Sequence, residues 1–259
     1  MKWNVHLSPV KPIPSNQQNV PLLFVHGWAM GPWIWDPLLP LLPAMQVNRV
    51  DLGFFGSPEI PALDNPLVIT HSLGLLWSMM HIPRPWRGLV CINSFTRFVA
   101  TEDFSGVNPH WLRRMKNRLQ QDPVGVVADF LRRCDPSQPS ALATSSAQPQ
   151  WSARPSSALQ APHLLEALPP TADWNRARLL QGLEWLEQWD LRAPFARMDC
   201  PVLAICGATD LIVRSAHSRV CFSEVPLIMV QNAGHLIPLT HAQWLAEKIM
   251  GATAAGQRP

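Results

Sequence analysis

The sequence predicts an α/β fold, with a mostly parallel central sheet flanked by helices and with an inserted helical lid. Apolar runs bounded by turn residues alternate with helical patterns over most of the chain, as strand–helix–strand units do. The length of 259 residues suits one large domain or a domain that carries a sizeable insertion. Residues 95–200 do not continue the alternation. We therefore expect the insertion there.

Six apolar runs are expected to form the strands of the sheet, because turn residues bound each of them. They are residues 20–27, 45–52, 66–72, 87–94, 201–210 and 225–235. The spacing of apolar residues predicts helices near residues 33–43, over residues 73–82 and over residues 240–250. We expect the first of these helices to begin at Gly31 and Pro32. Strands and helices thus alternate on both sides of the insertion.

The insertion contains helical and loop-like parts. Residues 108–134 have the pattern of two helices that are broken between Asp122 and Pro123. Residues 136–162 are rich in Pro, Ser, Ala and Gln, a composition typical of a mobile loop. We expect these parts to form a lid over the sheet.

A last helical pattern covers residues 171–192, with Thr171 and Asp173 as its candidate caps. After it the apolar strand-like runs resume. The chain is therefore divided into an α/β core, residues 1–96 and 193–259, and a helical lid, residues 97–192.

Composition excludes several classes of protein and of site. Charged residues make up 15% of the chain and its net charge is +3, which is too weakly basic for a nucleic-acid-binding protein. The five cysteines include no C-x-x-C pair, so neither a disulfide framework nor a zinc site is expected. We find no secretory signal at the start and no run of the roughly 18 apolar residues that a membrane span needs. We expect a monomeric cytoplasmic protein without a bound metal or cofactor.

Ser72 stands in the segment T-H-S-L-G, between a buried strand and a helical pattern. This is the context of a nucleophile on a sharp strand-to-helix turn. Serine is also a favoured N-cap of an ordinary helix. Gly74 would let the helix pass close to the strand, whereas Thr70 replaces the glycine that usually leads the motif. The local segment leaves both interpretations open.

The C-terminal part of the chain favours the nucleophile. A serine hydroxyl needs a base that takes its proton and an acid that orients this base. Asp210 ends the segment G-A-T-D after the fifth predicted strand, and His235 ends N-A-G-H after the sixth. The order Ser72, Asp210, His235 is the order expected of hydrolases with such a sheet. We predict that these residues form a catalytic triad.

The predicted oxyanion hole lies after the first strand, where the segment F-V-H-G-W ends in a His-Gly turn. Its donors are expected to be the backbone N–H groups of Trp28 and of Leu73, the residue after the serine. His71 precedes Ser72, and successive side chains near a strand end point apart. We expect His71 to line the pocket or to pack beneath the turn.

Five segments together resemble the α/β-hydrolase superfamily, in the expected order and at both ends of the chain. They are FVHGWAMGPWIWDPLLPLL, RVDLGFFGSP, THSLG, GATDLIV and NAGHLIPLTHAQWLAEKI. Within it the chain is most similar to the esterases of biotin synthesis that remove the methyl group from pimeloyl-acyl-carrier-protein methyl ester. This similarity rests on the HGW opening, on Trp35, and on the run INSFTRFVATEDFSGVNPHWLRRM after the fourth strand.

The resemblance implies a serine carboxylesterase that needs no cofactor and whose substrate is a small acyl ester carried on an acyl-carrier protein. It implies an acyl channel lined by Trp28, His71, Trp77, Phe95 and Phe98. It also implies that basic residues of the lid hold the acidic carrier, and residues 108–134 contain six basic residues against two aspartates. The expected carrier contacts are Arg113, Arg114, Lys116, Arg118, Arg132 and Arg133. A solvated helix face is the alternative for any single one of them.

Other interpretations stay open at this point. A different hydrolase of the same fold would act on another small ester, a thioester or a C–C bond. A protein of another class would keep the fold for ligand binding without turnover. Only 20 residues lie between Asp51 and Ser72, where members of the family usually have a helix, so we expect a loop or a single turn there.

Overall fold

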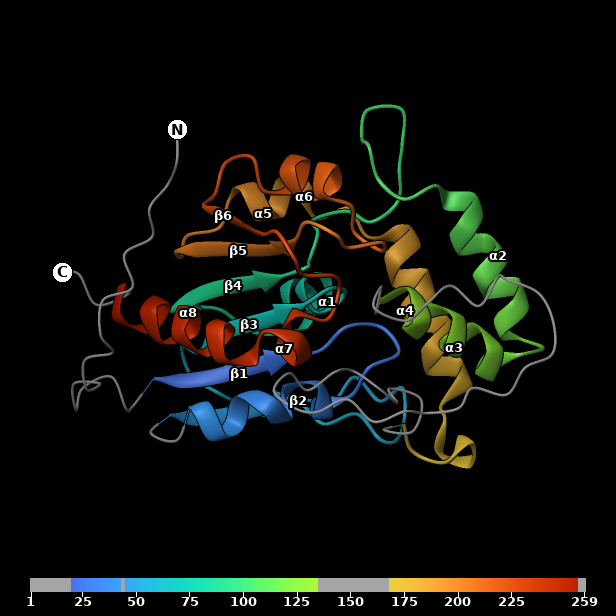
Figure 1. Cartoon of the computed structure of the whole chain (residues 1–259), viewed down its shortest axis with the longest axis horizontal. Coiled ribbons are helices and arrows are strands. Elements are labelled where there is room, and N and C mark those ends of the chain that lie inside the picture. The colour runs from blue at the N-terminus through green and yellow to red at the C-terminus, as the bar shows by residue number, and fades with distance from the viewer. Residues whose placement is uncertain (1–19, 43–44, 135–167, 256–259) are drawn as a thin grey trace, which may run out of the picture.

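A six-stranded sheet forms the centre of the molecule (Figure 1). The structure is a computed structural model that describes residues 20–42, 45–134 and 168–255. The strands are β1 (Pro21–Val25), β2 (Gln46–Val50), β3 (Leu67–His71), β4 (Gly88–Ile92), β5 (Val202–Gly207) and β6 (Leu227–Val230). All neighbouring pairs are parallel, in the order β2-β1-β3-β4-β5-β6. The predicted parallel sheet is confirmed, and each strand is shorter than the apolar run that predicted it.

Cover on both faces explains why the middle strands are continuous apolar runs. Every residue of β3 and of β4 is buried, and β1 is buried except at its first residue. A parallel sheet that is covered on both faces needs side chains that suit a core on either side. The edge strands β2 and β6 are mostly half-buried, as their position predicts.

The strand order reverses between β1 and β3. From β1 the chain crosses to β2 on one side, and from β3 it crosses to β4 on the other. Because such crossovers are right-handed, η2 (Pro32–Leu41) and α1 (Gly74–His81) cover opposite faces of the sheet. In sheets of this kind, ligands bind at the carboxyl ends of the strands where the order reverses. Ser72 and the His-Gly turn after β1 both lie at this point.

The helix after β1 and the C-terminal helices pack together. The η2 helix contacts α7 (Ile237–Thr240) and α8 (Ala242–Ala255), and α8 lies across the sheet, in contact with β4 (Figure 1). The η2 helix begins at Pro32 as predicted, but it is a 3-10 helix. Pro37 and Pro40 lie inside it and lack the N–H groups that an α-helix would use.

The connection from β2 to β3 contains no helix within residues 51–66, all of which the structure describes. Its backbone forms turns, and the N–H of Asp51 donates to the carbonyl of Glu59 at 2.9 Å. Three prolines in this stretch remove donors that a helix would need. The prediction of a loop or a single turn between these strands is therefore confirmed.

Three helices inserted between β4 and β5 lie beyond the carboxyl ends of the strands (Figure 1). We call α2 (Pro109–Leu119), α3 (Pro123–Cys134) and α4 (Arg176–Gln188) the lid helices. The break between α2 and α3 falls at Pro123 as predicted, and Asp122 accepts a hydrogen bond from the N–H of Gly125 at 2.8 Å. The predicted loop at 136–162 lies outside the described residues. None of the described helices is long and apolar enough to cross a membrane.

The helix predicted over residues 171–192 is split into two pieces. A short 3-10 turn, η3 (Thr171–Asp173), precedes α4. The side chain of Asn175 accepts a hydrogen bond from the N–H of Arg178 at 3.0 Å and so caps α4. The prediction that Thr171 or Asp173 caps this helix is wrong, because both residues belong to the separate turn.

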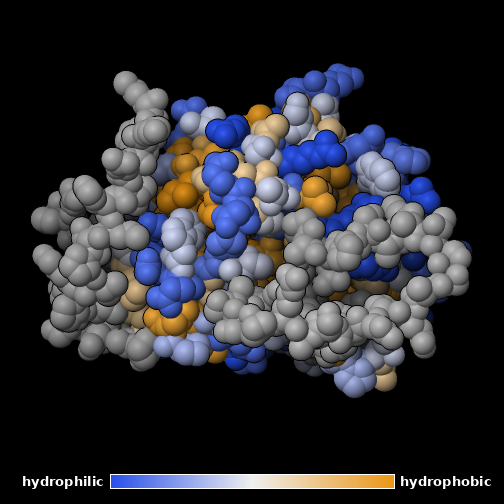
Figure 2. Space-filling view, viewed as in Figure 1, coloured by the Kyte–Doolittle hydropathy of each residue, from blue (hydrophilic) through white to orange (hydrophobic). Residues whose placement is uncertain are grey.

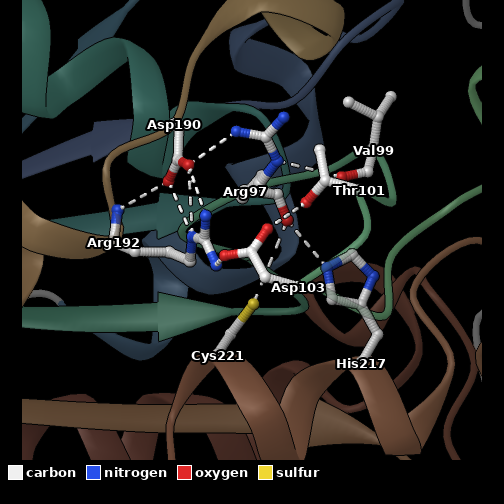
Figure 3. Close-up of polar contacts among 8 residues, drawn as sticks. All are labelled: Arg97, Val99, Thr101, Asp103, Asp190, Arg192, His217 and Cys221. Carbon is white, nitrogen blue, oxygen red and sulfur yellow. Dashed lines mark hydrogen bonds and ion pairs between the residues drawn. The ribbon is translucent and has the colours of Figure 1, made fainter.

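Ion pairs connect the two ends of the insertion (Figure 3). Arg97, which follows β4, lies 2.6 Å from the carboxylate of Asp190, and Arg192 lies 2.7 Å from the same oxygen. Arg192 also pairs with Asp103 at 2.9 Å. The network joins the segment after β4 to α5 (Arg192–Ala196), the helix that leads to β5.

The carboxylate of Asp190 should make the stability of the protein depend on pH. Hydrogen bonds from Arg192, and then from Arg97, lower the pKa of Asp190 from 3.8 to about 2. A carboxylate with a lowered pKa stabilises the folded state above its unfolded pKa and loses this contribution as the pH falls through its folded pKa. We expect Asp190→Asn to lower the free energy of unfolding by about 1 kcal/mol at neutral pH, since the group is partly exposed.

Urea unfolding of both proteins at several pH values measures this effect. The difference between them should shrink as the pH falls from about 4 to about 2, the window set by the two pKa values. Asp199→Asn is the control, because the side chain of Asp199 is 75% exposed and pairs only with Arg84 among the described residues. A difference that stays constant over this window would contradict the prediction.

Candidate active site

Ser72 occupies a sharp turn between β3 and α1. Its φ of +54° lies in the left-handed region, which costs energy for a residue with a Cβ. The helix begins at Gly74 with Leu73 as its N-cap, and no side chain caps it. The N–H of Ser72 donates to the carbonyl of Ile92 at 3.0 Å. The serine is therefore held in a strained turn and does not serve as a helix cap.

Two glycines allow the backbone around Ser72 to pack closely. A Cβ on Gly74 would lie 2.4 Å from the carbonyl oxygen of Val25, and a Cβ on Gly27 would lie 2.9 Å from the Cβ of Ser72. A side chain at either position would push β1 away from the turn. Thr70 replaces the usual first glycine of the motif without crowding the turn, because it is a residue of β3, where a β-branched side chain fits.

Asp210 and His235 form a buried pair in the loops after β5 and β6. His235 donates from Nδ1 to Asp210 Oδ2 at 2.7 Å, since a carboxylate can only accept. The other oxygen of Asp210 accepts from the N–H groups of Ile212 and Val213, at 2.7 and 2.9 Å. The Nε2 of His235 is buried without a partner among the described residues. This tautomer leaves Nε2 as a proton acceptor, which a general base requires.

His71 connects the turn at Ser72 with His235. Its Nε2 donates to the backbone carbonyl of His235 at 2.8 Å, and the centroids of the two rings lie 4.8 Å apart. Burial, followed by the nearby His235, holds the pKa of His71 well below its ordinary value, so this ring is neutral. His71 lies beneath the turn. It fixes the loop of His235 against the residue next to Ser72.

Asn93 is a residue of this site that the sequence analysis missed. It follows β4, is fully buried and has a φ of +46°. Its Nδ2 donates to Asp210 Oδ2 at 2.6 Å and to the carbonyl of Gly234 at 2.8 Å. Asn93 therefore holds the acid and the loop before His235 together. The sequence did contain a signal for Asn93, because it is a polar residue at the carboxyl end of a buried strand, where such sheets carry functional groups.

The turn after β1 carries the first of the two predicted oxyanion donors. Within the part of the chain that the structure describes, neither the N–H of Trp28 nor that of Leu73 has an acceptor. His26 shapes the turn, because its Nδ1 donates to the carbonyl of Gly27 at 2.9 Å and its Nε2 accepts from the N–H of Leu52 at 3.0 Å. Two N–H groups without an internal acceptor are suited to a developing negative charge.

A cavity of about 730 Å³ lies between the lid helices and the core. This volume is typical of sites for small organic ligands. The rings of Trp28 and Phe130 meet edge-on in its wall, with centroids 4.9 Å apart, and the ring of Phe130 lies 6.3 Å from that of His235. Ser72 and His235 do not line the cavity themselves. Phe130 therefore lies between the cavity and His235.

The residues predicted to contact the acyl chain take different places. Trp28 and Phe98 line the cavity. Phe95 is fully buried against Phe98, with ring centroids 4.8 Å apart. Trp77 is buried in α1, and His71 lies beneath the turn, so neither lines the cavity. The structure thus brings two of the five to the cavity wall, while Phe95 supports that wall from behind.

The predicted carrier contacts fall into two groups. Arg114, Arg118 and Arg133 line the cavity, whereas Arg113, Lys116 and Arg132 do not. Three of the six are paired within the protein: Arg118 with Asp122 and Asp129, Arg132 with Asp129, and Lys116 with Glu187 of α4. Arg113, Arg114 and Arg133 have no ion-pair partner among the described residues. Half of the basic cluster is therefore not committed to an ion pair within the described residues, and Arg133 lies over the ring of Trp111.

His217 is a second residue of the site that the sequence analysis did not find. It lies in α6 (Ser215–Cys221), lines the cavity, and donates from Nε2 to the carbonyl of Arg97 at 2.7 Å. Burial lowers the pKa of His217, which keeps the ring neutral.

No group of three or more metal-binding side chains occurs in the described part of the chain. The arrangement of Ser72, the Asp210–His235 pair and the two N–H groups of Trp28 and Leu73 is suited to acyl transfer.

The chain is similar in sequence to a group of curated proteins. The pimeloyl-[acyl-carrier protein] methyl ester esterase of Pectobacterium atrosepticum is 26% identical over 259 residues, which cover 92% of this chain and 95% of that protein. The protein of the same name from Xanthomonas oryzae pv. oryzae is 29% identical over 257 residues, which cover 90% and 95%. No protein-family model matches the chain.

Solved structures share its fold. The esterase EaEST from Exiguobacterium antarcticum superposes with a TM-score of 0.70 at 16% identity, covering 91% of this chain and 92% of that one. A bromoperoxidase from Bacillus anthracis gives a TM-score of 0.73 at 16% identity, with the same coverage of 91% and 92%. At such identities the likeness extends to the fold, and one fold hosts many reactions.

Proposed function

The chain has the α/β-hydrolase fold, and from this premise we propose that it is a serine carboxylesterase that hydrolyses the methyl ester of a pimeloyl group carried on acyl-carrier protein. The observation that carries the proposal is the buried pair of Asp210 and His235. Its Nε2 has no partner among the described residues, and His71 joins the pair to the strained turn of Ser72. These are the parts of a serine hydrolase. The names of the sequence relatives supply the substrate.

In the proposed reaction Ser72 attacks the ester carbonyl and His235 takes the proton of its hydroxyl at Nε2. Asp210 keeps the proton on Nδ1 and stabilises the charged ring. The N–H groups of Trp28 and Leu73 stabilise the oxyanion of the tetrahedral intermediate. His235 then gives its proton to the leaving methanol. Water, activated by the same histidine, releases the acid from Ser72.

The cavity supports an acyl substrate. Apart from His217, its buried lining is apolar and includes Trp28, Phe98, Leu112 and Phe130. Such a wall favours a methylene chain, because burying each CH₂ group stabilises the complex by about 0.8 kcal/mol. The lid arginines that form no ion pair within the described residues favour an acidic partner at the surface. Together these properties suit an acyl chain that enters from a carrier protein.

Methanol release from pimeloyl-carrier-protein methyl ester by the purified protein tests the proposal, with free methyl pimelate as the comparison. We expect kcat/KM to be at least about tenfold higher for the carrier-bound ester, since binding energy from remote groups raises turnover. Hydrolysis of free short esters alone would discard the carrier while keeping the esterase. Absence of hydrolysis with every ester would contradict the proposal as a whole.

Charge reversal of a single exposed arginine separates carrier binding from chemistry. Arg113→Glu should lower kcat/KM for the carrier-bound ester by about threefold to tenfold, because rim charges mainly steer association. Arg113 does not line the cavity and has no ion-pair partner within the described chain, so the free ester should be hydrolysed as before. Equal loss on both esters would indicate damage to the lid helices instead.

A further inference from the structure

The outer part of the cavity between lid and core is cationic. Four arginines line the cavity: Arg114 of α2, Arg118, Arg133 of α3, and Arg214 of the core. Asp129 lines it too, but it is already paired with Arg118 and Arg132. Arg114, Arg133 and Arg214 have no ion-pair partner among the residues that the structure describes. Within the part of the chain that the structure describes, these three arginines line the same cavity without a carboxylate partner, although they come from three separate elements.

Helix periodicity brings the lid arginines to the cavity. Trp111, Arg114, Met115 and Arg118 follow the spacing i, i+3, i+4, i+7 along α2, which puts them on one face. Val126, Asp129, Phe130 and Arg133 follow the same spacing along α3. Both helices therefore turn a mixed apolar and charged face towards the same space. Figure 2 shows the outside of this region, at the right of the view, where strongly hydrophilic side chains lie beside hydrophobic ones.

The side chains that line the cavity are mainly apolar in its buried inner part and mainly cationic in its exposed outer part. Its buried members include Trp28, Phe98 and Phe130. Its exposed members include the four arginines, Asn108 and two large apolar residues, Trp111 at 48% exposure and Leu211 at 59%. An exposed tryptophan and leucine beside arginines that form no ion pair within the described residues are typical of a surface that receives a ligand with both apolar and anionic parts; Arg133 lies over the ring of Trp111. The cavity therefore fits a long ligand that has an apolar inner end and an anionic outer end.

We propose that Arg114, Arg133 and Arg214 bind the phosphate of the phosphopantetheine arm by which an acyl group hangs from its carrier, so that the arm itself is recognised at the mouth of the cavity. The inference rests on the proposed function and adds to it a site that lies partly on the core. Guanidinium groups bind phosphate oxygens through paired N–H donors, and three of them in the lining of one cavity suit a phosphate better than a single carboxylate.

His217 supplies the contact expected further along the arm. Because its Nε2 donates to the carbonyl of Arg97, Nδ1 carries no proton in the neutral ring and can only accept. This nitrogen has no partner within the described residues. The pantetheine part of the arm contains two amide N–H groups, which are donors of the matching kind. The phosphate at the mouth and an amide at His217 would direct the acyl chain towards Phe130 and the turn of Ser72.

Calorimetric titration of the full chain with pantetheine and with 4′-phosphopantetheine tests the phosphate site directly, without turnover and without the carrier protein. The phosphorylated compound should bind about tenfold more tightly, since hydrogen bonds between charged groups are the strong ones. Arg133→Gln and Arg214→Gln should each remove most of this difference. Equal affinity for the two compounds would overturn the proposal.

Two of the three arginines, Arg114 and Arg214, have a neighbour of the same charge that serves as a control. Arg113→Gln matches Arg114→Gln on α2, and Arg219→Gln matches Arg214→Gln, because neither Arg113 nor Arg219 lines the cavity. The control variants should keep the tenfold preference for 4′-phosphopantetheine. If they lose as much of this preference as the test variants, the phosphate is attracted by the general positive potential of the surface and not by a specific site. Monomethyl pimelate is the third ligand. If it binds as tightly as 4′-phosphopantetheine and with the same dependence on Arg133, the arginines hold a free carboxylate and the phosphate assignment is wrong.

The outcome is separable from that of the proposed function. Preference for the phosphorylated arm together with no hydrolysis of the carrier-bound ester would keep the phosphate site and refute the methyl esterase. Hydrolysis of that ester without any phosphate preference would keep the esterase and refute the site.

Discussion

Replacing Ser72 by alanine is expected to lower kcat/KM for ester hydrolysis by at least about 10⁴-fold. The variant keeps His235, its bond to Asp210 and the two backbone donors, but it has no hydroxyl to attack the carbonyl. Hydrolysis of p-nitrophenyl butyrate measures the loss, and circular dichroism checks that the fold is kept. Turnover near the wild-type level would show that another group attacks the ester, and the assignment of Ser72 would then be wrong.

A second substitution at the same position tests the strain of the turn. Alanine has a Cβ and keeps the cost of the φ of +54°, whereas glycine adopts this conformation freely. We expect Ser72→Gly to be as inactive as Ser72→Ala and more stable than it by about 1 kcal/mol in urea unfolding. Equal stability of the two variants would mean that the turn is not strained. Ser72→Gly would thus relieve the strain of the turn but lose the activity, which is the relation expected at a strained functional site.

The sequence allowed much of the sheet to be predicted, because its information is local. Each strand is an apolar run ended by turn residues, and the loop between Asp51 and Ser72 could be expected from its length and prolines. The cap of α4 was less accessible. Thr171, Asp173 and Asn175 are all suitable caps, and the choice depends on where the 3-10 turn ends. Local propensity does not distinguish such neighbours.

The parts of the site that could not be predicted depend on contacts between distant segments. Asn93 acts on Asp210, which lies 117 residues further along the chain, because β4 and β5 are neighbours in the sheet. Lys116 was an expected carrier contact, but it pairs with Glu187 from another helix. The helical spacing of the lid arginines is visible in the sequence. Which face of α2 is turned towards the core is set by packing and not by that spacing.

Replacing Asn93 by glycine is expected to lower kcat by about 10-fold to 100-fold, because a hydrogen bond to a charged group contributes about 1.5–3 kcal/mol. The variant removes the donor that lies 2.6 Å from Asp210 Oδ2, while glycine keeps the φ of +46° without strain. Asn93 does not line the cavity, so KM should change little. Asn65 has the same φ of +46° and is exposed, which makes Asn65→Gly a matched control with unchanged kcat. A kcat of the Asn93 variant equal to that of the control would contradict a positioning role.

Asn93→Asp separates the role of the donor from that of side-chain shape. The new carboxyl would lie in contact with Asp210, and two carboxylates so close cannot both ionise easily, so the pair binds one proton with a raised apparent pKa. While that proton is bound, the new acid can donate to Asp210 as the amide does. Once it is lost at higher pH, repulsion replaces the hydrogen bond and disturbs the orientation of His235. The ratio of kcat between variant and wild type should therefore fall as the pH rises. A purely structural role of Asn93 predicts a ratio that does not change with pH, because a packing defect carries no titrating group.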